Sequence, residues 1–495
     1  MHLVDLLTLA LIAIALIALV LRNLSRWLGK QPPGPWNIPL IGSAVALLGA
    51  SKNPLREPYA AMANLSRKYG GIMTVGLGNE TWIVLSGLKE IKEFSMKSEA
   101  VSRPVMPSLN SLYAFNEQLG VIFADGRLWS DQRRFMAKSL KVIQTGYKPF
   151  GEHIMDEFNL FRAHLLDESA KCPDFNGRDF FDIASLNIIW RLAVGERFDY
   201  KSKVGKEMIN HVEAFTMEQT LGIIGGVAYA RYMPYLSGVY RSVEMHMEKL
   251  RKFLWEKAVS RAERGNDDDC NYAALFHQSE GEFATNKQLV VSLLDFFTGG
   301  SGTVSKTMSF ALLFMLHYPK AQEKVRREAL AVATDEEEIG LEHASSMPYT
   351  EAFLLEVQRL ASVLPICPPR VVTKATQLNG YTLREGQKVQ MNLFAMHRDP
   401  DHWGDPENFR PERFLDEQGR VTVDEWLQPF GYGKRKCVGE SIAKTTVFLF
   451  ICNLVKHFDL LAPKVLPGTA PNGGLTLTPE NFIVRLQPLR KSVTL

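Results

Sequence analysis

The chain has 495 residues, of which 46% are hydrophobic and 22% charged, and its formal net charge is +3 at pH 7. This is the composition of a folded globular protein, and it excludes a long disordered chain. The small net charge gives no general attraction for nucleic acid, so any basic region acts only locally. Five scattered cysteines without paired spacing argue against a disulfide framework and a structural zinc site.

The chain begins with an apolar segment. Residues 6–21 contain no charged side chain, and three cations follow by residue 30. With its flanks, such a helix spans a hydrocarbon core of about 30 Å, and the cationic side is expected to remain cytosolic. We therefore predict a transmembrane signal anchor over residues 1–22, with a cleaved signal peptide as the alternative. A basic linker, stiffened by prolines, is predicted over residues 23–36.

Residues 37–495 are predicted to form one mainly α-helical domain with a minor β-sheet region. Alternating β-branched residues over about 70–86 indicate a short hairpin. Helical patterns dominate from about 88 to 330, and the longest runs from Asn286 to Tyr318, where Pro319 stops it. Further short strands are expected at 371–373 and 388–391.

Three glycines interrupt the long helix just before Thr303. Each glycine inside a helix costs about 1 kcal/mol relative to alanine. Three of them within residues 298–305 therefore indicate a functional reason.

A pair of opposite charges lies in the next helical segment, predicted over Tyr349 to Leu360. Glu356 and Arg359 are three residues apart, which places them on one face of the helix. Their apolar neighbours indicate burial, where an ion pair needs further partners. Arg413 is able to supply one through a bidentate bond, although such pairs alone are weak evidence.

Residues 430–439 read Phe-Gly-Tyr-Gly-Lys-Arg-Lys-Cys-Val-Gly and precede a helical pattern. Nearby cations, a helix N-terminus and backbone N–H groups stabilise a thiolate, here that of Cys437. Glycines allow the backbone to fold closely around the sulfur. The segment indicates a cysteine held as a metal-bound anion. The alternative is a basic surface turn with an incidental cysteine.

In their order and approximate spacing, these motifs resemble the cytochrome P-450 family, specifically its microsomal members. His397-Arg398-Asp399-Pro400 and Trp403 also match, and the resemblance covers residues 30–495. It implies the cytochrome P-450 fold and a heme b cofactor whose iron is bound by Cys437, with thiolate donation that favours O–O cleavage. Glu356, Arg359 and Arg413 would form the structural triad of the family.

The resemblance also implies which other residues surround the cofactor. Guanidinium and indole N–H groups are suitable donors to the heme propionates. The matching cofactor-binding positions are Trp129, Arg133, Arg370 and Arg435, with Phe430, Gly433 and Gly439 in the cysteine loop.

Thr303 matches the family alcohol that helps deliver protons to oxygen, and with Cys437 it forms the expected catalytic pair. One position departs from the family pattern. The residue before this threonine is usually Asp or Glu, but here it is Gly302. The usual carboxylate relay is therefore absent, or replaced by water, Ser301 or Ser305.

The implied activity is insertion of one oxygen atom from O2 into a lipophilic substrate with electrons from NADPH. The chain has no complete G-x-G-x-x-G motif, so the electrons should come from a partner, NADPH–cytochrome reductase, with a cytochrome b-type donor as an addition. The expected location is the endoplasmic reticulum membrane, crossed once, with the catalytic domain in the cytosol. The side chains expected to face an acidic partner are Lys434, Arg435, Lys436, Arg127, Arg134, Lys138 and Lys141.

The chain most resembles insect microsomal members that act on hormones, and the specific expectation is epoxidation of methyl farnesoate in juvenile hormone biosynthesis. Steroid or ecdysteroid hydroxylation and xenobiotic oxidation are the alternatives. Candidate substrate contacts are Phe115, Phe297, Val363 and Leu475, and residues 223–227 are expected to touch the membrane.

Two other classes of function stay open at this stage. One is a peroxide isomerase or dehydratase, which needs no reductase. The other is a membrane-tethered heme carrier or sensor without enzymatic activity. Retention of Thr303 and of an unbroken cysteine loop favours monooxygenation over both.

Overall fold

The structure is a computed structural model. It describes residues 13, 17, 31–38, 41–53, 57–78, 80–145, 150–218, 230–234, 236–259, 271–334 and 337–489. Nearly all of the predicted anchor and the apolar segment 223–227 lie outside these residues. Among the helices that are described, none combines the length and the apolar character that a bilayer crossing requires.

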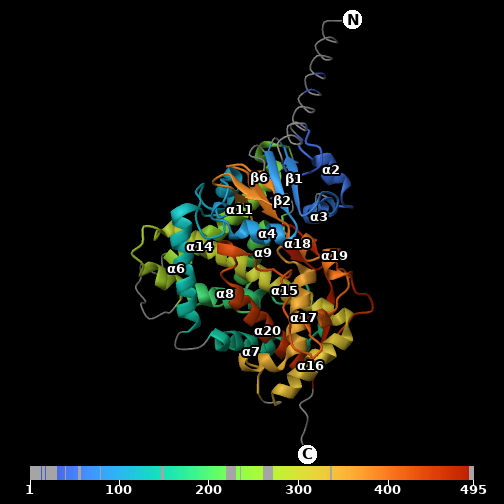
Figure 1. Cartoon of the computed structure of the whole chain (residues 1–495). Helices are drawn as coiled ribbons and strands as arrows, with labels where there is room; N and C mark the ends of the chain where they lie inside the picture. The colour runs from blue at the N-terminus through green and yellow to red at the C-terminus, as the bar shows by residue number, and fades with distance from the viewer. Residues whose placement is uncertain are drawn as a thin grey trace, which may run out of the picture.

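A four-stranded sheet lies at one end of the molecule, at the top in Figure 1. Its strands are β1 (Ile72–Leu77), β2 (Glu80–Leu85), β7 (Lys388–Met391) and β4 (Arg370–Val371), in the order β1-β2-β7-β4. β1 and β2 form an antiparallel hairpin, whereas β2 and β7 pair in parallel. The predicted hairpin and the strand near residue 390 are confirmed, and the strand near residue 371 begins one residue earlier than expected.

Three smaller sheets complete the β structure. They are β3 (Asp174–Asn176), β11 (Ile483–Pro488) and β8 (Phe458–Leu461); β5 (Thr376–Leu378) and β6 (Tyr381–Leu383); and β9 (Asn472–Gly473) and β10 (Leu477–Thr478).

The start of the body packs directly onto β1. The Thr74 N–H donates to the Pro33 carbonyl at 2.7 Å, and its hydroxyl donates to the Pro32 carbonyl at 2.8 Å. Gly34 lies so close that a Cβ there would be 2.0 Å from the Thr74 oxygen. The packed body therefore begins inside the segment that was predicted as a linker, residues 23–36.

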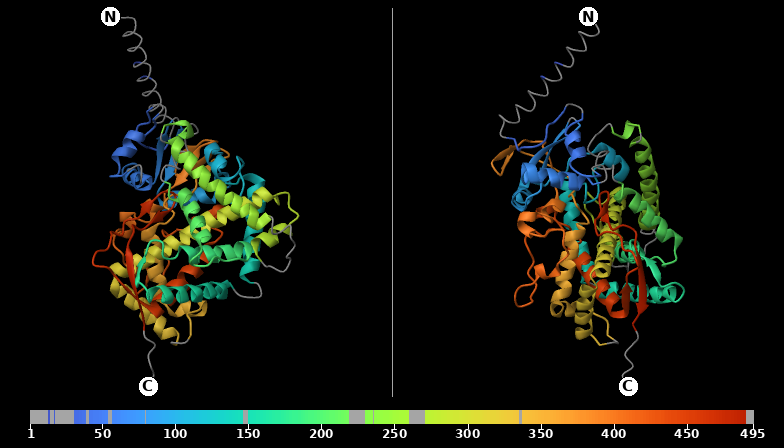
Figure 2. Two further views of the ribbon diagram at one scale, coloured as in Figure 1. Left: turned by 180° about the vertical axis from the view of Figure 1, so that it is seen from behind. Right: turned by 90° about the vertical axis from the view of Figure 1, so that its right-hand side faces the viewer.

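Helices form the rest of the molecule, as Figures 1 and 2 show. They are α2 (Ala44–Gly49), α3 (Pro58–Tyr69), α4 (Leu88–Met96), α5 (Pro107–Tyr113), α6 (Gly126–Gln144), α7 (Phe150–Ser169), α8 (Asp182–Val194), α9 (Lys203–Thr216), α11 (Leu236–Leu254), α13 (Tyr272–His277), α14 (Asn286–Phe296), α15 (Gly302–His317), α16 (Pro319–Val332), α17 (Pro348–Ala361), α18 (Leu393–Met396), α19 (Pro400–Trp403) and α20 (Glu440–His457). The predicted class, mainly α with minor β, is confirmed.

The predicted long helix is continuous but changes its winding at the glycines. α14 passes into a π-helical turn, η4 (Phe297–Ser301), and then into α15. Such π-bulges widen a helix locally and are frequent at functional sites. Pro319 begins α16, as expected from its missing N–H.

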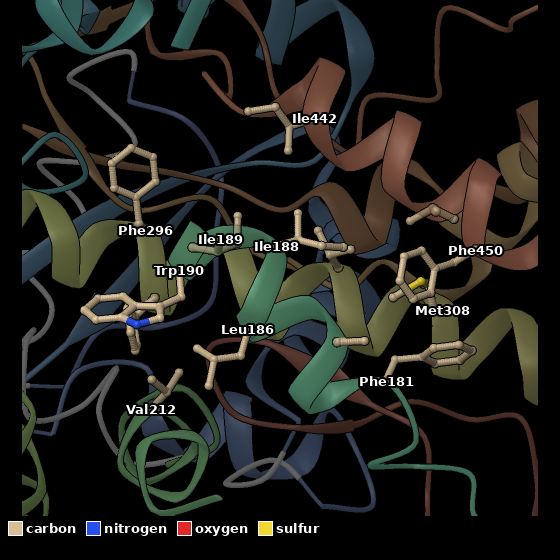
Figure 3. Close-up of a cluster of buried hydrophobic side chains, with 14 of the residues drawn as sticks. Phe181, Leu186, Ile188, Ile189, Trp190, Val212, Phe296, Met308, Ile442 and Phe450 are labelled. Atoms are coloured by element: carbon tan, nitrogen blue, oxygen red, sulfur yellow. The ribbon is translucent and has the colours of Figure 1, made fainter. Parts of the chain in front are cut away.

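The main core surrounds α8 and α15, which pack on each other, and α15 also packs on α17 and α20. Figure 3 shows side chains of four helices meeting there: Trp190 from α8, Val212 from α9, Met308 from α15 and Phe450 from α20. Full burial of an aliphatic or Phe side chain contributes roughly 1.5–3 kcal/mol. The glycine-bearing turn η4 packs on α8 beside this core.

Candidate functional site

The cysteine loop folds tightly before α20. Gly431 and Gly433 have φ values of 73° and 70°, a left-handed conformation that strains other residues. A Cβ at Gly433 would also lie 2.1 Å from the backbone oxygen of Ser95, at the end of α4. The Cys437 N–H donates to the Phe430 carbonyl at 2.9 Å and closes the loop. The geometry thus requires glycine at Gly433, one of the predicted positions, and favours it at Gly431, whereas Gly439 has neither a positive φ nor a close neighbour.

The Cys437 side chain is exposed, yet protein surrounds it closely enough for burial to raise the pKa of its thiol. A side chain with both properties faces a space within the fold and not the outer surface. The Gly439 N–H and the cations of Arg133 and Lys436 lower the same pKa. The loop therefore provides the donors and positive charge that a thiolate requires.

The π-helical turn opens a second internal surface. Gly299 is exposed and Gly302 and Thr303 are half-buried, although the preceding residues 288–298 are buried. A Cβ on Gly302 would meet none of the described atoms within 4 Å. The Thr303 hydroxyl donates to the Gly299 carbonyl at 2.8 Å. This face of the helix therefore borders open space.

The two serines considered as replacements for the missing acid point elsewhere. The Ser301 hydroxyl is buried and donates to the Phe297 carbonyl at 2.6 Å. Ser305 is also buried, and its hydroxyl donates to Asp182 on α8. Both hydroxyls are engaged within the core, so of the alternatives for the missing acid, replacement by water and absence of a relay are the two that these contacts leave open.

Four of the predicted propionate donors gather between α6, β4 and the cysteine loop. The guanidinium carbon of Arg435 lies 3.8 Å above the Trp129 ring. Burial, and then the like charges of Arg370 and Arg133, lower the pKa of Arg435 to about 9. Burial likewise lowers the pKa of Arg370 to about 10. The sequence thus identified residues that are neighbours in space although they are far apart in the chain.

Arg103 belongs to the same cluster and was missed. It is 7% exposed, and burial together with Arg370 and Arg435 lowers its pKa well below the usual range. Its guanidinium donates to the carbonyls of Ile122 and Pro368. Arg103 precedes a proline and belongs to no motif, so its sequence context does not indicate that it lies near the other arginines.

The cluster has more cationic charge and more donors than the protein satisfies. Asp125 is the one carboxylate that pairs with it among the described residues, 3.3 Å from Arg435. Within the same described part of the chain, the Trp129 indole nitrogen and the Arg370 Nε are buried without a hydrogen-bond partner. Buried charge and unpaired donors are costly, so the cluster is stabilised by an anionic group. A cofactor with two carboxylates fits it.

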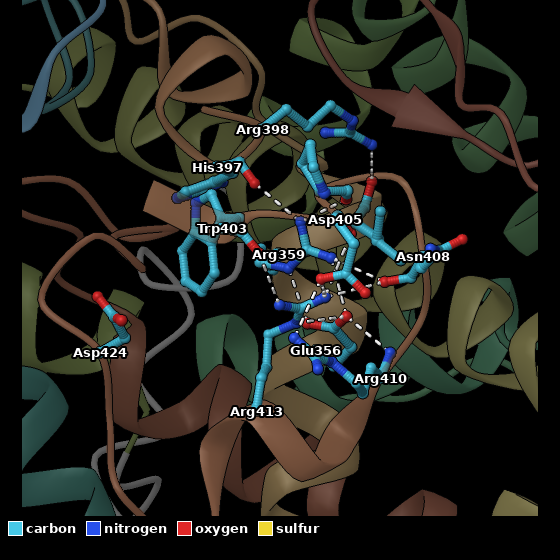
Figure 4. A network of polar contacts seen from close by, with 12 residues as sticks. Glu356, Arg359, His397, Arg398, Trp403, Asp405, Asn408, Arg410, Arg413 and Asp424 are labelled. Atoms are coloured by element: carbon cyan, nitrogen blue, oxygen red, sulfur yellow. Dashed lines mark hydrogen bonds and ion pairs between the residues drawn. The ribbon is translucent and has the colours of Figure 1, made fainter. Parts of the chain in front are cut away.

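Glu356 and Arg359 form a network of a different kind, shown in Figure 4. Both side chains are fully buried, and Arg359 makes a bidentate pair with Glu356 at 2.7 and 2.8 Å. Arg413, from the turn η6 (Pro411–Phe414), makes one bond to Glu356 at 3.0 Å. The expected triad is therefore in contact, but Arg359 and not Arg413 supplies the bidentate pair.

The candidate substrate contacts separate into two groups. Phe297 is fully buried and packs edge-on against Trp190 with 5.1 Å between ring centres, so its ring belongs to the core. Phe115 is half-buried beneath the Arg251 guanidinium. Val363 and Leu475 are both half-buried, and Leu477, two residues after Leu475, donates its N–H to the Val363 carbonyl at 2.8 Å. A half-buried apolar surface thus exists at Val363 and Leu475.

Of the side chains predicted to form a basic docking surface, all but Arg435 are exposed. Arg127 and Arg134 are 83% and 79% exposed, and Lys434 and Lys436 are exposed beside them in the loop. Lys138 and Lys141 on α6 are exposed as well. The Arg435 side chain is only 2% exposed and lies inside the arginine cluster. It therefore cannot contact a docked partner.

Cys437 is exposed to a space within the fold, and a buried cationic cluster with unpaired donors lies near it; this combination fits a heme-thiolate protein. The family model for cytochrome P-450 matches residues 32–486, and the chain belongs to this family. It is a monooxygenase with a heme cofactor. Among its relatives, cytochrome P-450 2J3 of Rattus norvegicus is 32% identical over 88% of this chain and 86% of its own length.

Two insect relatives are also similar. Farnesoate epoxidase of Bombyx mori is 30% identical over 92% of this chain and 94% of its own length. Cytochrome P-450 18a1 of Drosophila melanogaster is 28% identical over 96% of this chain and 90% of its own length. Both matches cover at least 90% of this chain and at least 90% of the relative's own length.

Proposed function

We propose that Cys437 binds the heme iron and that Trp129, Arg133, Arg370 and Arg435 hold the propionates, with Arg103 as a further cation. The observation that carries this assignment is the pair of buried, unpartnered donors on Trp129 and Arg370. Heme bound through a thiolate supplies the redox chemistry that cleaves dioxygen. Phe430, Gly433 and Gly439 shape the loop, and the Glu356–Arg359–Arg413 triad fixes the elements behind it.

The role proposed for Thr303 follows from its place on the open face of the π-helical turn. Its hydroxyl donates to the carbonyl of Gly299, which lies within the π-helical turn. The neighbouring glycines leave room for dioxygen and water. Thr303→Ala should therefore divert electrons to hydrogen peroxide, measured as peroxide released per NADPH consumed, whereas Thr303→Ser should retain coupling.

The substrate that we propose is methyl farnesoate, which would be epoxidised. The similarity to the farnesoate epoxidase of Bombyx mori over nearly the whole chain supports this choice. The apolar surface at Val363 and Leu475 suits a flexible isoprenoid chain, because such sites are lined mainly by apolar side chains. Steroids, ecdysteroids and xenobiotics are the alternative substrates.

A substrate panel tests this proposal. The purified enzyme, NADPH and reductase are incubated with methyl farnesoate, ecdysteroids and apolar xenobiotics, and products are analysed by mass spectrometry. A product one oxygen atom heavier is expected from methyl farnesoate, with at least about tenfold higher kcat/KM than for the others, which corresponds to about 1.4 kcal/mol. Equal or faster turnover of another class would overturn the substrate assignment.

Peroxide isomerisation is the second candidate function, because an acid is missing at Gly302. An isomerase or dehydratase would turn over a lipid hydroperoxide without NADPH or reductase. We expect such turnover to be negligible beside the NADPH-dependent rate. The two assays together separate both functions from a carrier, which would show neither.

The proposed electron donor is NADPH–cytochrome reductase, assisted by a cytochrome b-type protein, docked on Lys434, Lys436, Arg127 and Arg134. The proposed arrangement is a membrane anchor over residues 1–22 and a linker that begins at residue 23 and ends where Pro32 and Pro33 bond to β1, with the catalytic domain on the cytosolic side of the endoplasmic reticulum. Charge reversal at Lys434 should slow reduction at low salt, and the difference should shrink as salt screens the surface. Charge reversal at Arg485, which is exposed and paired with Asp174 on the three-stranded sheet, serves as the control.

A further inference from the structure

Asp295 is a buried carboxylate near the end of α14, and the monooxygenase chemistry assigned above leaves it without a role. It is 6% exposed and accepts hydrogen bonds from the Tyr113 hydroxyl at 2.8 Å and from the Val121 and Ile122 N–H groups. All of these donors are neutral. Burial raises the pKa of Asp295 to about 7, although the three donors each lower it. The carboxyl therefore changes its proton occupancy near neutral pH.

Two hydroxyl groups extend from this carboxyl toward the π-helical turn. The Tyr113 oxygen lies 2.7 Å from the Thr298 hydroxyl, and Thr298 is the second residue of η4. Burial and the neighbouring Asp295 raise the pKa of Tyr113 well above its usual value, so Tyr113 keeps its proton. Asp295, Tyr113 and Thr298 thus form an unbroken chain of proton-carrying oxygens.

The direction of the bonds in this chain depends on Asp295. When the carboxyl is ionised, Tyr113 donates to it. When it is protonated, its O–H donates to Tyr113, Tyr113 donates to Thr298, and Thr298 donates to the Leu294 carbonyl, 2.9 Å away. The protonated chain is therefore polarised toward the turn.

Thr298, the last member of this hydrogen-bonded series, lies next to the open face of the π-helical turn. Thr298 directly precedes Gly299, which is exposed, and Gly299 accepts the Thr303 hydroxyl. Asp295, Gly299 and Thr303 recur every four residues and so follow one side of the helix. A Cβ at Gly302 would meet no described atom within 4 Å, so water has room to lie beside the Thr303 hydroxyl at this face.

We propose that Asp295, acting through Tyr113 and Thr298, is the internal proton reservoir that replaces the carboxylate missing at Gly302. The inference depends on the role proposed for Thr303. In one transfer, Asp295 gives its proton to Tyr113, Tyr113 gives its own to Thr298, and Thr298 releases one through water to Thr303. Asp295 then regains a proton from solvent, so each proton delivered leaves the relay unchanged.

Other titratable groups near Asp295 are engaged elsewhere. Tyr272, on α13, accepts from Gln132 at 2.6 Å. Arg251, on α11, donates to the Leu112 carbonyl, and Arg103 donates to the Ile122 carbonyl. Lys287 pairs with Glu117 at 2.7 Å on the surface. The described structure therefore shows Asp295 bonded to no cation that would hold it permanently ionised.

The protonation state of Asp295 is testable without turnover. Infrared spectra of the resting protein should show a protonated carboxyl stretching band that disappears as the pH rises through about 7. Asp295→Asn should remove the band. Tyr113→Phe should move its midpoint upward, because a donor to the carboxylate is lost. A band that titrates near the ordinary aspartate value, or one unaffected by Asp295→Asn, would overturn the proposal.

The transfer itself is tested with variants that leave the Asp295 contacts to Val121 and Ile122 in place. Tyr113→Phe and Thr298→Val should each raise the peroxide released per NADPH by about tenfold and increase the solvent isotope effect on product formation. Tyr272→Phe is the matched control, because it also removes a buried hydroxyl beside α14, and it should leave both quantities unchanged.

The outcomes separate this inference from the function on which it depends. If Thr303→Ala uncouples the enzyme but Tyr113→Phe and Thr298→Val behave like Tyr272→Phe, the relay is refuted and the role of Thr303 stands. If Thr303→Ala also remains coupled, the role of Thr303 fails as well.

Discussion

The protein buries two groups of arginines, and the two differ in how well their charges are satisfied. In the network around Glu356, Arg359 pairs with the carboxylate at 2.7 Å and also donates to the His397 and Pro406 carbonyls. In the cluster around Arg435, burial lowers the pKa values of Arg103, Arg370 and Arg435, and repulsion by neighbouring arginines lowers those of Arg103 and Arg435 as well. Two buried donors there, on Trp129 and Arg370, bond to nothing in the described chain.

The difference distinguishes a structural network from a binding site. A buried ion pair whose donors all find acceptors is complete, and it positions the helices that supply it. A buried cationic cluster with unpaired donors is complete only when an anion arrives. Sequence spacing alone cannot make this distinction, because both groups consist of arginines separated by long stretches of chain.

The largest expected effect follows from removing the sulfur beside the incomplete cluster. Cys437→Ser should abolish turnover and the long-wavelength carbon monoxide band typical of thiolate-bound heme, because no soft anionic ligand remains. Difference spectra and product assays measure this. Cys172→Ser, at an exposed cysteine near β3, should leave both unchanged. Turnover that survived Cys437→Ser would refute the ligand assignment.

Breaking the ion-pair network around Glu356 should strongly lower the free energy of unfolding. Glu356→Gln leaves the buried Arg359 without its counter-charge, and we expect the free energy of unfolding to fall by about 3–5 kcal/mol. Denaturant unfolding of the cofactor-free protein measures this. The control is Glu323→Gln, which breaks an exposed pair with Arg327 and should not move the midpoint. An equal response of the two variants would show that the Glu356 network is not structural.

Loss of an arginine from the cluster around Arg435 should not lower the free energy of unfolding, in contrast to Glu356→Gln. Arg370→Gln removes a buried, repelled charge, so the free energy of unfolding of the cofactor-free protein should not fall. Heme release should accelerate by about tenfold, the effect of losing about 1.4 kcal/mol of binding. Transfer of heme to an apoprotein acceptor measures the rate, and Arg134→Gln on the surface is the control. Destabilisation comparable to that of Glu356→Gln would remove the distinction between the two groups.

The smallest effect concerns the open face of the helix. Gly302→Glu should stabilise the protein by about 0.5 kcal/mol, because glutamate favours a helix over glycine and its Cβ enters open space. Gly300→Glu is the matched control, since a Cβ there would lie 2.9 Å from Ile189. Thermal unfolding should move upward for the first variant and downward for the second. A downward shift for both would show that the space at Gly302 is closed.

The sequence predicted well those features that depend on local pattern. The hairpin over β1 and β2, the stop at Pro319 and the glycine-dependent turn before Cys437 all follow from backbone preferences of single residues. The triad and most of the cluster were located through motifs. Their bonding was not, because the choice between Arg359 and Arg413 as bidentate partner depends on how η6 approaches α17.

Features that arise only from packing escaped prediction. Arg103 and Asp295 lie in no motif, and their importance comes from burial beside chain segments distant in sequence. Arg435 was expected both inside the fold and on its surface, and only the structure decides between the two. Phe297, a candidate substrate contact from its position in the sequence, packs against Trp190 in the core.

The close approach of Gly433 to the backbone of Ser95 has a consequence for how the protein is assembled. During synthesis, α4 leaves the ribosome more than three hundred residues before the cysteine loop, and a domain generally folds as a unit. The loop can therefore close onto Ser95 only after most of the chain has been made. Heme binding should accordingly be among the last steps of folding. A nascent chain arrested before residue 430 should show no heme absorbance.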